Sequence, residues 1–106
     1  MLNRFRVADA EVETFLTRAR AAVGVLAERP GFVGADLGRN LDDPALFTIT
    51  TRWHNVGSYR RALSSYEAKV VVVPLLSLAI DEPSAYADVD EVGPNLARGS
   101  GPLRLS

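Results

Sequence analysis

The sequence predicts one α+β domain, in which helical segments alternate with the strands of a four-stranded antiparallel sheet. Three observations predict this class. Stretches with alternating apolar and polar residues indicate strands. One long stretch carries apolar residues at helical spacing. The chain of 106 residues, 47% hydrophobic and 24% charged, is long enough for one core and too short for two.

The first strand is predicted at residues 2–7, with Asn3, Phe5 and Val7 on its core face. A long helix is predicted next, from Asp9 as N-cap to Arg29, because the proline that follows disfavours helical geometry at the residue before it. The apolar face of this helix consists of Val12, Phe15, Leu16, Ala19, Val23 and Leu26.

Residues 32–39 and 45–53 are predicted to form an antiparallel hairpin, because turn-forming residues join them. Alternation along the second strand separates two sets of side chains. The bulky set is Phe47, Ile49, Thr51 and Trp53, and the opposite set is Leu46, Thr48, Thr50 and Arg52. We expect the bulky set to face the core.

A helical segment is predicted after the hairpin, with Asn55 as its N-cap and Ser64-x-x-Glu67 as a capping box for a second helix. The run from Val70 to Val73 favours a strand by propensity, whereas the capping box favours a helix, and we expect the helix. Pro74 is expected to open a further helical turn.

Residues 84–89 are predicted as the last strand. The resulting order is the split β-α-β arrangement of ferredoxin-like folds, with a four-stranded antiparallel sheet and helices on one face. A bare opposite face with Leu46, Thr48 and Thr50 would be covered best by a second copy, which predicts a homodimer with its sheets face to face. Residues 91–106, rich in Gly and Pro, are predicted to be a tail or an arm packed on the partner chain.

The amino-acid composition limits the kinds of molecule and metal that this protein is expected to bind. A net charge of -1 provides no field for nucleic acid or an anionic membrane. The absence of cysteine excludes disulfides, Cys-ligated metals and a thiol nucleophile, and the acidic residues show no metal-ligand spacing, so we expect no metal. The sequence has no apolar signal core and no apolar run long enough for a bilayer, so a cytoplasmic location is expected.

Several short motifs occur in a familiar order. They are Arg29-Pro30-Gly31-Phe32, Asp42-Asp43-Pro44, Arg52-Trp53, Tyr59-Arg60-x-Ala62-Leu63, Val73-Pro74-Leu75-Leu76 and Pro83-Ser84-Ala85-Tyr86. Together they resemble the antibiotic biosynthesis monooxygenase (ABM) domain. The resemblance covers roughly residues 2–90, which predicts a domain at 1–90 and a tail at 91–106. It implies a ferredoxin-like unit that dimerises through its sheets into an α+β barrel.

The resemblance implies two chemistries. Heme-degrading members are similar to this chain at Asn3 and Trp53, but their axial histidine would fall at Ala62 or Leu63, which cannot ligate iron. The quinone-forming members oxidise a three-ring phenol without metal or flavin. They are similar at Trp53 and Tyr59, and their basic residue corresponds to Lys69. One pocket asparagine of theirs is replaced by Ile49, which removes a hydrogen-bond donor.

Cofactor-free oxygenation requires an apolar pocket and groups that set the charge of a phenol. We therefore predict Trp53 and Phe47 as stacking walls, Tyr59 and Asn3 as hydrogen-bonding groups, and Lys69 as the charge that faces a phenolate.

Ile49 and Arg52 complete the predicted substrate contacts. His54 is the predicted general base, because histidine alone titrates near neutral pH when unperturbed. Each role has a structural alternative: core packing for the aromatic residues, backbone hydrogen bonds for Asn3, and solvated or interface charges for Lys69, Arg52 and His54.

Two hypotheses of different classes follow. The first is a homodimeric monooxygenase that oxidises an electron-rich aromatic or quinol with O2 and no cofactor. The second is a non-catalytic dimeric barrel that binds a small apolar ligand. Heme degradation is kept as a less favoured third alternative, because its axial ligand is missing from the sequence.

Overall fold

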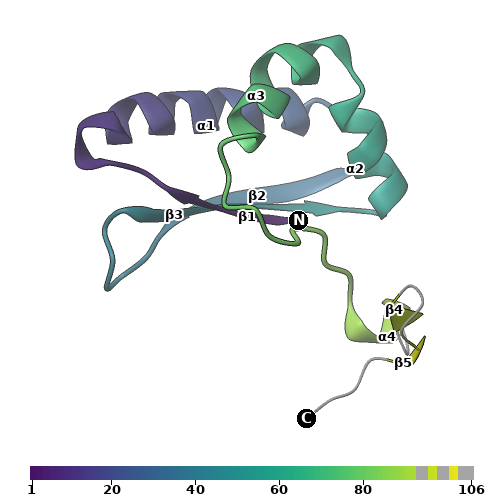
Figure 1. The fold of residues 1–106 in the computed structure, drawn as a ribbon. Helices are drawn as coiled ribbons and strands as arrows, with labels where there is room; N and C mark the ends of the chain where they lie inside the picture. Colours follow the sequence, from purple (N-terminus) through teal and green to yellow (C-terminus); the bar gives the residue numbers. More distant parts are fainter. Residues whose placement is uncertain (93–95, 98–100, 103–106) are drawn as a thin grey trace.

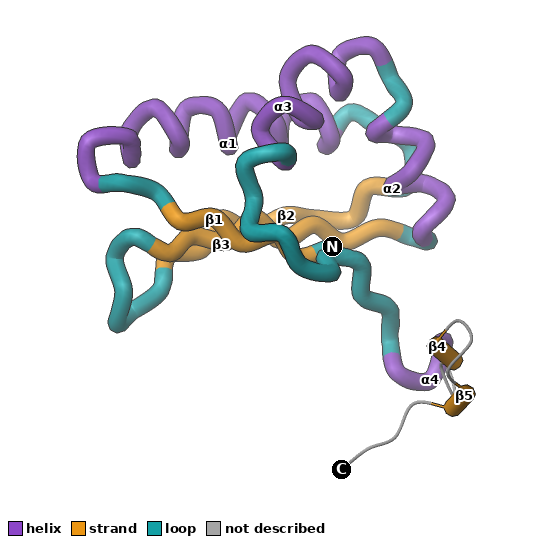
Figure 2. Tube along the Cα trace, in the orientation of Figure 1, coloured by secondary structure: helices purple, strands orange, loops and turns teal. Residues whose placement is uncertain are grey.

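The computed structural model describes residues 1–92, 96–97 and 101–102. A three-stranded antiparallel sheet has the order β1-β3-β2, with helices on one of its faces (Figure 1 and Figure 2). The strands are β1 (Leu2–Arg6), β2 (Phe32–Arg39) and β3 (Leu46–Trp53). The helical elements are a 3-10 turn (Asp9–Glu11), α1 (Val12–Ala27), α2 (Val56–Leu63), a π-helical turn (Ala68–Val72), α3 (Val73–Leu76) and α4 (Val89–Val92). A second, two-stranded antiparallel sheet consists of β4 (Leu96–Ala97) and β5 (Gly101–Pro102).

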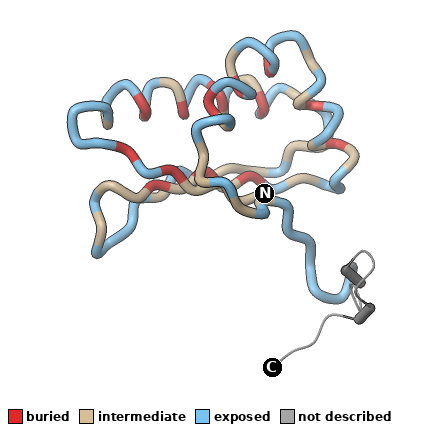
Figure 3. Tube along the Cα trace, in the orientation of Figure 1, coloured by how far each residue is buried: buried red, intermediate tan, exposed pale blue. Residues whose placement is uncertain are grey.

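The core lies between the sheet and the helices, as the alternation of side chains predicts. Phe5 of β1 and Phe47 of β3 are paired across the sheet, and both rings pack on Phe15 of α1, with centroids 5.0 and 5.3 Å away. Ile49 and Thr51 are buried on the same face of β3. Figure 3 shows the buried positions along the facing sides of sheet and helices. The predicted core faces of β1 and β3 are therefore confirmed.

The long helix is confirmed, but its start differs from the prediction. Asp9 does not act as the N-cap of α1. It opens the 3-10 turn instead, and α1 begins at Val12 without a side-chain cap. The buried residues of α1 are Phe15, Ala19, Ala22 and Leu26, so that two alanines let the helix approach the sheet closely. The hairpin of β2 and β3 is confirmed, and Asn40 accepts hydrogen bonds from the backbone N–H groups of Asp42 and Asp43 in its turn.

The valine run is helical, as expected, although in an unusual form. Ala68 and Val72 of the π-helical turn are fully buried, and this turn packs on α1. Tertiary packing of these two residues outweighs the strand propensity of the run. Pro74 stands in the first turn of α3, where its missing N–H costs no hydrogen bond. The capping box is wrong by one residue, because Ser65, not Ser64, accepts the N–H of Ala68.

The predicted fourth strand is wrong. Residues 84–88 are not a strand, and Val89 begins α4. The chain does pass the free edge of β1, where a fourth strand of this topology would stand. Only two backbone hydrogen bonds form there, from Ile80 N–H to the Arg4 carbonyl (2.8 Å) and from Leu2 N–H to the Ser84 carbonyl (2.7 Å). Pro83, which lies between these two contacts, has no N–H to donate, and residues 80–84 form no regular ladder with β1.

We call residues 80–91 the strap. The strap is fixed beside β1 by a two-pronged ion pair, in which Arg4 Nε and Nη2 donate to the Glu82 carboxylate at 2.8 and 2.6 Å. The strap ends within α4, and the pair of β4 and β5 lies apart from the main sheet (Figure 1). The domain boundary near residue 90 stays a prediction, and the predicted arm, residues 91–106, lies partly outside the described residues. In the described part, no helix has the length and apolarity needed to cross a membrane.

Candidate functional site

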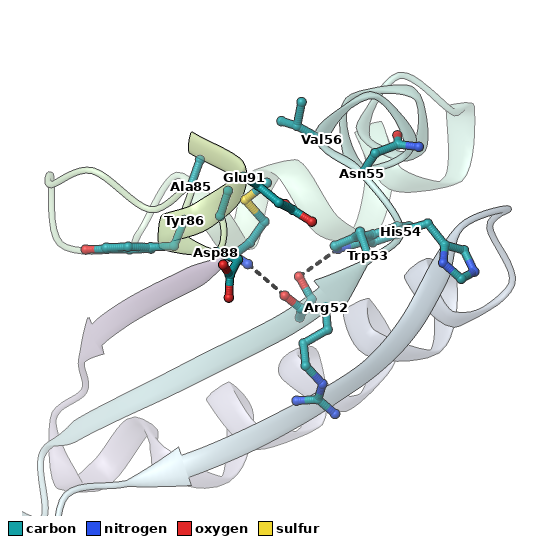
Figure 4. Close-up of a pocket in the computed structure, with 12 residues that line it drawn as sticks. Arg52, Trp53, His54, Asn55, Val56, Ala85, Tyr86, Asp88 and Glu91 are labelled. Carbon is teal, nitrogen blue, oxygen red and sulfur yellow. Dashed lines mark hydrogen bonds between the residues drawn. The ribbon is translucent and has the colours of Figure 1, made fainter. Parts of the chain in front are cut away.

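A cleft of about 600 Å³ opens at the carboxyl end of β3, between that strand and the strap (Figure 4). This volume lies within the range of small-molecule sites, roughly 300–1,000 Å³. One wall comes from the end of β3 and the start of α2, and the other wall comes from the strap. The lining residues are Met1, Thr51, Arg52, Trp53, His54, Asn55, Val56, Ala85, Tyr86, Ala87, Asp88 and Glu91.

Trp53 is the aromatic wall of the cleft, and its indole is held by three neighbours. Its Nε1–H donates to the hydroxyl of Thr51, at 2.9 Å. The Phe32 ring meets it edge-on at a centroid distance of 5.3 Å, and the Tyr59 ring lies tilted at 5.7 Å. Aromatic pairs in such geometries prefer one relative orientation. The indole is therefore fixed before any ligand arrives.

Tyr59 supports Trp53 and is not among the residues that line the cleft. Its position follows from α2, which begins at Asn55. The Asn55 side chain accepts the backbone N–H of Ser58 at 2.8 Å, which places Tyr59 on the first turn beside the end of β3. Burial raises the pKa of the Tyr59 phenol, because the charged phenolate would lose its solvation. Tyr59 is thus a neutral phenol at physiological pH.

Two carboxylates and two cationic groups line the cleft. Asp88 and Glu91 both line it, and in Figure 4 the Glu91 side chain extends from the strap toward the end of β3. Arg52 contributes to the lining, but its guanidinium donates to Asp36 at 2.7 Å on the open face of the sheet. The Met1 amino group donates to the Thr51 carbonyl at 2.7 Å, and burial followed by the nearby Arg52 lowers its pKa.

Four predicted site residues lie elsewhere. Phe47 and Ile49 are core residues, each 3% exposed, and Phe47 lies roughly 20 Å along the strand from Trp53 at about 3.3 Å per residue. Lys69 is exposed on the π-helical turn and does not line the cleft. Asn3 is half-buried on the helix-facing side of β1, paired with Ile49 and diagonal to Thr51.

His54 and Arg52 line the cleft only at its margin. The His54 imidazole is exposed and turned away from the face of Trp53 (Figure 4), as the strand alternation predicts. Arg52 is turned along the opposite face of the sheet toward Asp36. The structure thus brings Trp53 and Tyr59 into contact, and Lys69 and Phe47 do not line the cleft beside Trp53.

The donor set does not fit a heme. Ala62 is 1% exposed and packed in the core, and Leu63 offers no ligand atom. The single histidine of the sequence, His54, has its imidazole turned away from the face of Trp53. No group of three or more metal-binding side chains occurs among the described residues.

Sequence reasoning missed the strap carboxylates and the role of Thr51. Asp88 and Glu91 reach the cleft only because the strap passes the free edge of β1, and no local pattern predicts that path. Thr51 had a usable signal. It is a hydroxyl on the core face two residues before the tryptophan, it is 4% exposed, and a buried hydroxyl needs a partner.

Comparisons with known proteins agree with this architecture. SnoaB, a cofactor-independent oxygenase from Streptomyces nogalater, matches in a variant structure with 28% identity and a TM-score of 0.64, over 74% of this chain and 80% of that chain. A second SnoaB structure matches with 27% identity and a TM-score of 0.58, over 83% and 92%. A conserved protein from Methanosarcina mazei Go1 shares the fold, with 20% identity and a TM-score of 0.65 over 79% and 82%.

Among curated proteins, no sequence matches this chain. The family model described as antibiotic biosynthesis monooxygenase matches residues 1–72, which is most of the chain. These residues include β1, α1, the hairpin, α2 and the π-helical turn, so the match spans the strands of the main sheet and the elements that position Trp53. The chain therefore belongs to the antibiotic biosynthesis monooxygenase family.

Proposed function

We propose that this protein is a monooxygenase that oxidises an electron-rich aromatic or quinol-type molecule with O2 and without a cofactor. One observation carries the proposal: a preorganised indole, Trp53, forms the wall of a cleft large enough for a small aromatic molecule. Membership of the family and similarity to SnoaB, a cofactor-independent oxygenase, support the same reaction class.

The proposed reaction balances without an external reductant. In an anthrone, a CH2 group and O2 become C=O and H2O. The carbon loses four electrons, which O2 accepts; one oxygen atom forms the carbonyl and the other leaves as water with the two protons. The substrate enters this sequence by losing a proton to give a delocalised anion, which passes the first electron to O2. The protein must therefore bind the ring, accept the proton and restrict water.

Named residues can carry these tasks. Trp53 would stack on the substrate ring, while Phe32 and Tyr59 hold the indole in place. Asp88 and Glu91 are the carboxylates on the cleft wall that could accept the proton. Tyr59 acts in this proposal through Trp53, as a positioning residue.

The second hypothesis, ligand binding without turnover, is favoured by the placement of two side chains. The His54 imidazole is turned away from the face of Trp53, and Lys69 does not line the cleft, so neither the predicted base nor the predicted cation faces the aromatic wall. A cleft that only binds would retain its affinity for aromatic ligands and would not consume O2. The experiment below separates these two outcomes.

The test is oxygen consumption with a panel of anthrones and hydroquinones. We expect the purified protein to accelerate quinone formation above the rate with heat-inactivated protein, which corrects for spontaneous oxidation, and to retain this activity after treatment with a chelator. Trp53→Ala should lower kcat/KM by roughly tenfold or more. The matched control is Tyr66→Phe, at an exposed aromatic on the helical side, which should retain full activity. Ligand binding without O2 uptake would overturn the monooxygenase proposal and favour the binding module.

We also propose that two copies pair through the open faces of their sheets. Gly34 and Gly38 of β2 lie on this face beside Arg52 and Thr48. Because glycine has no side chain, neither position projects a side chain of its own from the face, which keeps it flat. Its charges are compensated within the chain, since Arg52 pairs with Asp36 at 2.7 Å and Arg6 pairs with Asp43 at 2.9 Å. A flat face without excess charge suits contact with a second copy.

Sedimentation analysis tests this pairing. Thr50→Arg would place a charge near the middle of the open face and should yield monomers. Thr17→Arg, at an exposed position of α1 on the opposite side, is the matched control and should leave the dimer intact. A wild-type protein that sediments as a monomer would overturn the proposed pairing.

A further inference from the structure

The strap gives the cleft an acidic wall opposite its aromatic wall. Asp88 and Glu91 both line the cleft, across from the end of β3. The Asp88 carboxylate accepts the backbone N–H of Asp90 through Oδ1 at 2.8 Å, and the Glu91 N–H donates to the Asp88 carbonyl at 3.0 Å. This local turn holds the two acidic residues together on the cleft side of the strap.

Two cationic groups, Arg52 and the Met1 amino group, also line the cleft. The guanidinium of Arg52 is engaged by Asp36 on the open face of the sheet. The Met1 amino group donates to the Thr51 carbonyl at 2.7 Å, and burial lowers its pKa. Lys69 does not line the cleft. A ligand carboxylate in this space would meet the two carboxylates of the strap, whereas one of the two lining cations is paired with Asp36 and the other already donates to a backbone carbonyl.

We infer that Asp88 and Glu91 are specificity-determining residues, and that the cleft accepts uncharged electron-rich aromatics and rejects aromatics that carry a carboxylate. This inference rests on the proposed function, because it takes the cleft as the substrate site. Like charges that are brought together at a partly desolvated surface oppose binding, and salt screens the repulsion.

The test uses two ligands that differ in one group. Aloe-emodin and rhein are the same dihydroxyanthraquinone with a hydroxymethyl or a carboxyl substituent, and at neutral pH only the carboxyl of rhein is ionised. Binding is followed by quenching of Trp53, the single tryptophan of the chain, which lies in the cleft wall. A free tryptophan derivative corrects for light absorption by the ligands.

We expect aloe-emodin to bind about tenfold more tightly than rhein at low salt, and the difference to shrink at high salt. The variant Asp88→Asn with Glu91→Gln should bind rhein about as well as aloe-emodin. The Asp88→Asn change retains a side-chain oxygen that can accept the Asp90 N–H, so the turn is conserved. The matched control is Asp90→Asn, which removes a charge from the same helix at a position outside the cleft lining and should retain most of the discrimination.

The outcomes separate the two proposals. Equal binding of both ligands by the wild type would overturn the selectivity and leave the cleft as a binding site. Binding of neither ligand would overturn the cleft as an anthraquinone-type site, and with it the inference. Discrimination that persists unchanged in the double variant would show that Asp88 and Glu91 do not determine it.

Discussion

Replacement of Gly31 by alanine should destabilise the protein by about 2–5 kcal/mol. Gly31 connects α1 to β2 and adopts a φ of 88°, a left-handed conformation that costs an L-residue about 1–2 kcal/mol. An added Cβ would also lie 2.3 Å from the Ser58 Oγ and 2.4 Å from the Ser58 Cβ. Because atoms in contact prefer about 3.5–4.0 Å, the first turn of α2 would have to move, at a cost of roughly 1–3 kcal/mol.

The position matters for the cleft as well as for stability. The Gly31 carbonyl accepts the backbone N–H of His54 at 2.8 Å, so this turn is bonded to the junction that follows Trp53. A displaced turn should therefore disturb the indole. The assay is urea unfolding, followed both by Trp53 fluorescence and by circular dichroism, so that local and global changes are distinguished.

A second glycine provides the control. Gly24 is exposed within α1, and an added Cβ would meet no atom within 4 Å. Gly24→Ala should therefore stabilise the protein by about 1 kcal/mol through helix propensity. In a Ser58→Gly background the cost of Gly31→Ala should fall to the backbone part alone, about 1–2 kcal/mol. The reasoning is refuted if Gly31→Ala and Gly24→Ala change the free energy of unfolding by similar amounts.

Three further substitutions probe the strap, the indole support and the core. Arg4 holds the pKa of the Glu82 carboxyl below its ordinary value, so the stability from this pair is present at neutral pH and is lost as pH falls through the lowered pKa. The wild type should therefore be more stable than Glu82→Gln in urea unfolding at neutral pH, and this difference should disappear in acid. Because burial raises the pKa of Tyr59, the contribution of its neutral phenol to folding stability is present below the ordinary tyrosine pKa and is lost as pH rises through the raised one. Tyr59→Phe should abolish this loss of stability at alkaline pH, which is measured by urea unfolding over a series of pH values. Leu75→Ala, at a fully buried site, should cost about 2–5 kcal/mol in denaturant unfolding, whereas Leu41→Ala, at a fully exposed site, should cost less than about 0.5 kcal/mol.

Much of the fold could be predicted from local pattern. The alternation in β1 and β3 predicts that Phe5, Phe47 and Ile49 lie on the helix-facing side, where they are buried, because successive side chains of a strand point to opposite faces of the sheet. Asn55 capped its helix as expected, since a side-chain acceptor beside free N–H groups is a local arrangement. The start of α1 was less predictable, because a 3-10 turn intervenes after Asp9.

The candidate site was only half predictable. Trp53 and Tyr59 are six residues apart in the sequence, and the short junction between β3 and α2 brings their rings together. The position of Lys69 relative to Trp53 depends on how α2 and the π-helical turn pack. In the structure Lys69 is exposed to solvent. Phe47 shares a face with Trp53, but length along the strand separates them, and a common face does not make a common site.

The sequence by itself determined the layers of this protein. Side-chain periodicity and turn residues specify which faces are buried and where elements begin and end, because both depend on neighbours in the chain. Only the tertiary structure decided the path of the strap. That path depends on the ion pair between Arg4 and Glu82, which are 78 positions apart in the sequence, and on two backbone contacts with β1. Because these contacts join residues far apart in the sequence, no local pattern could predict that residues 84–88 would not form a strand or that Asp88 and Glu91 would line the cleft with Trp53.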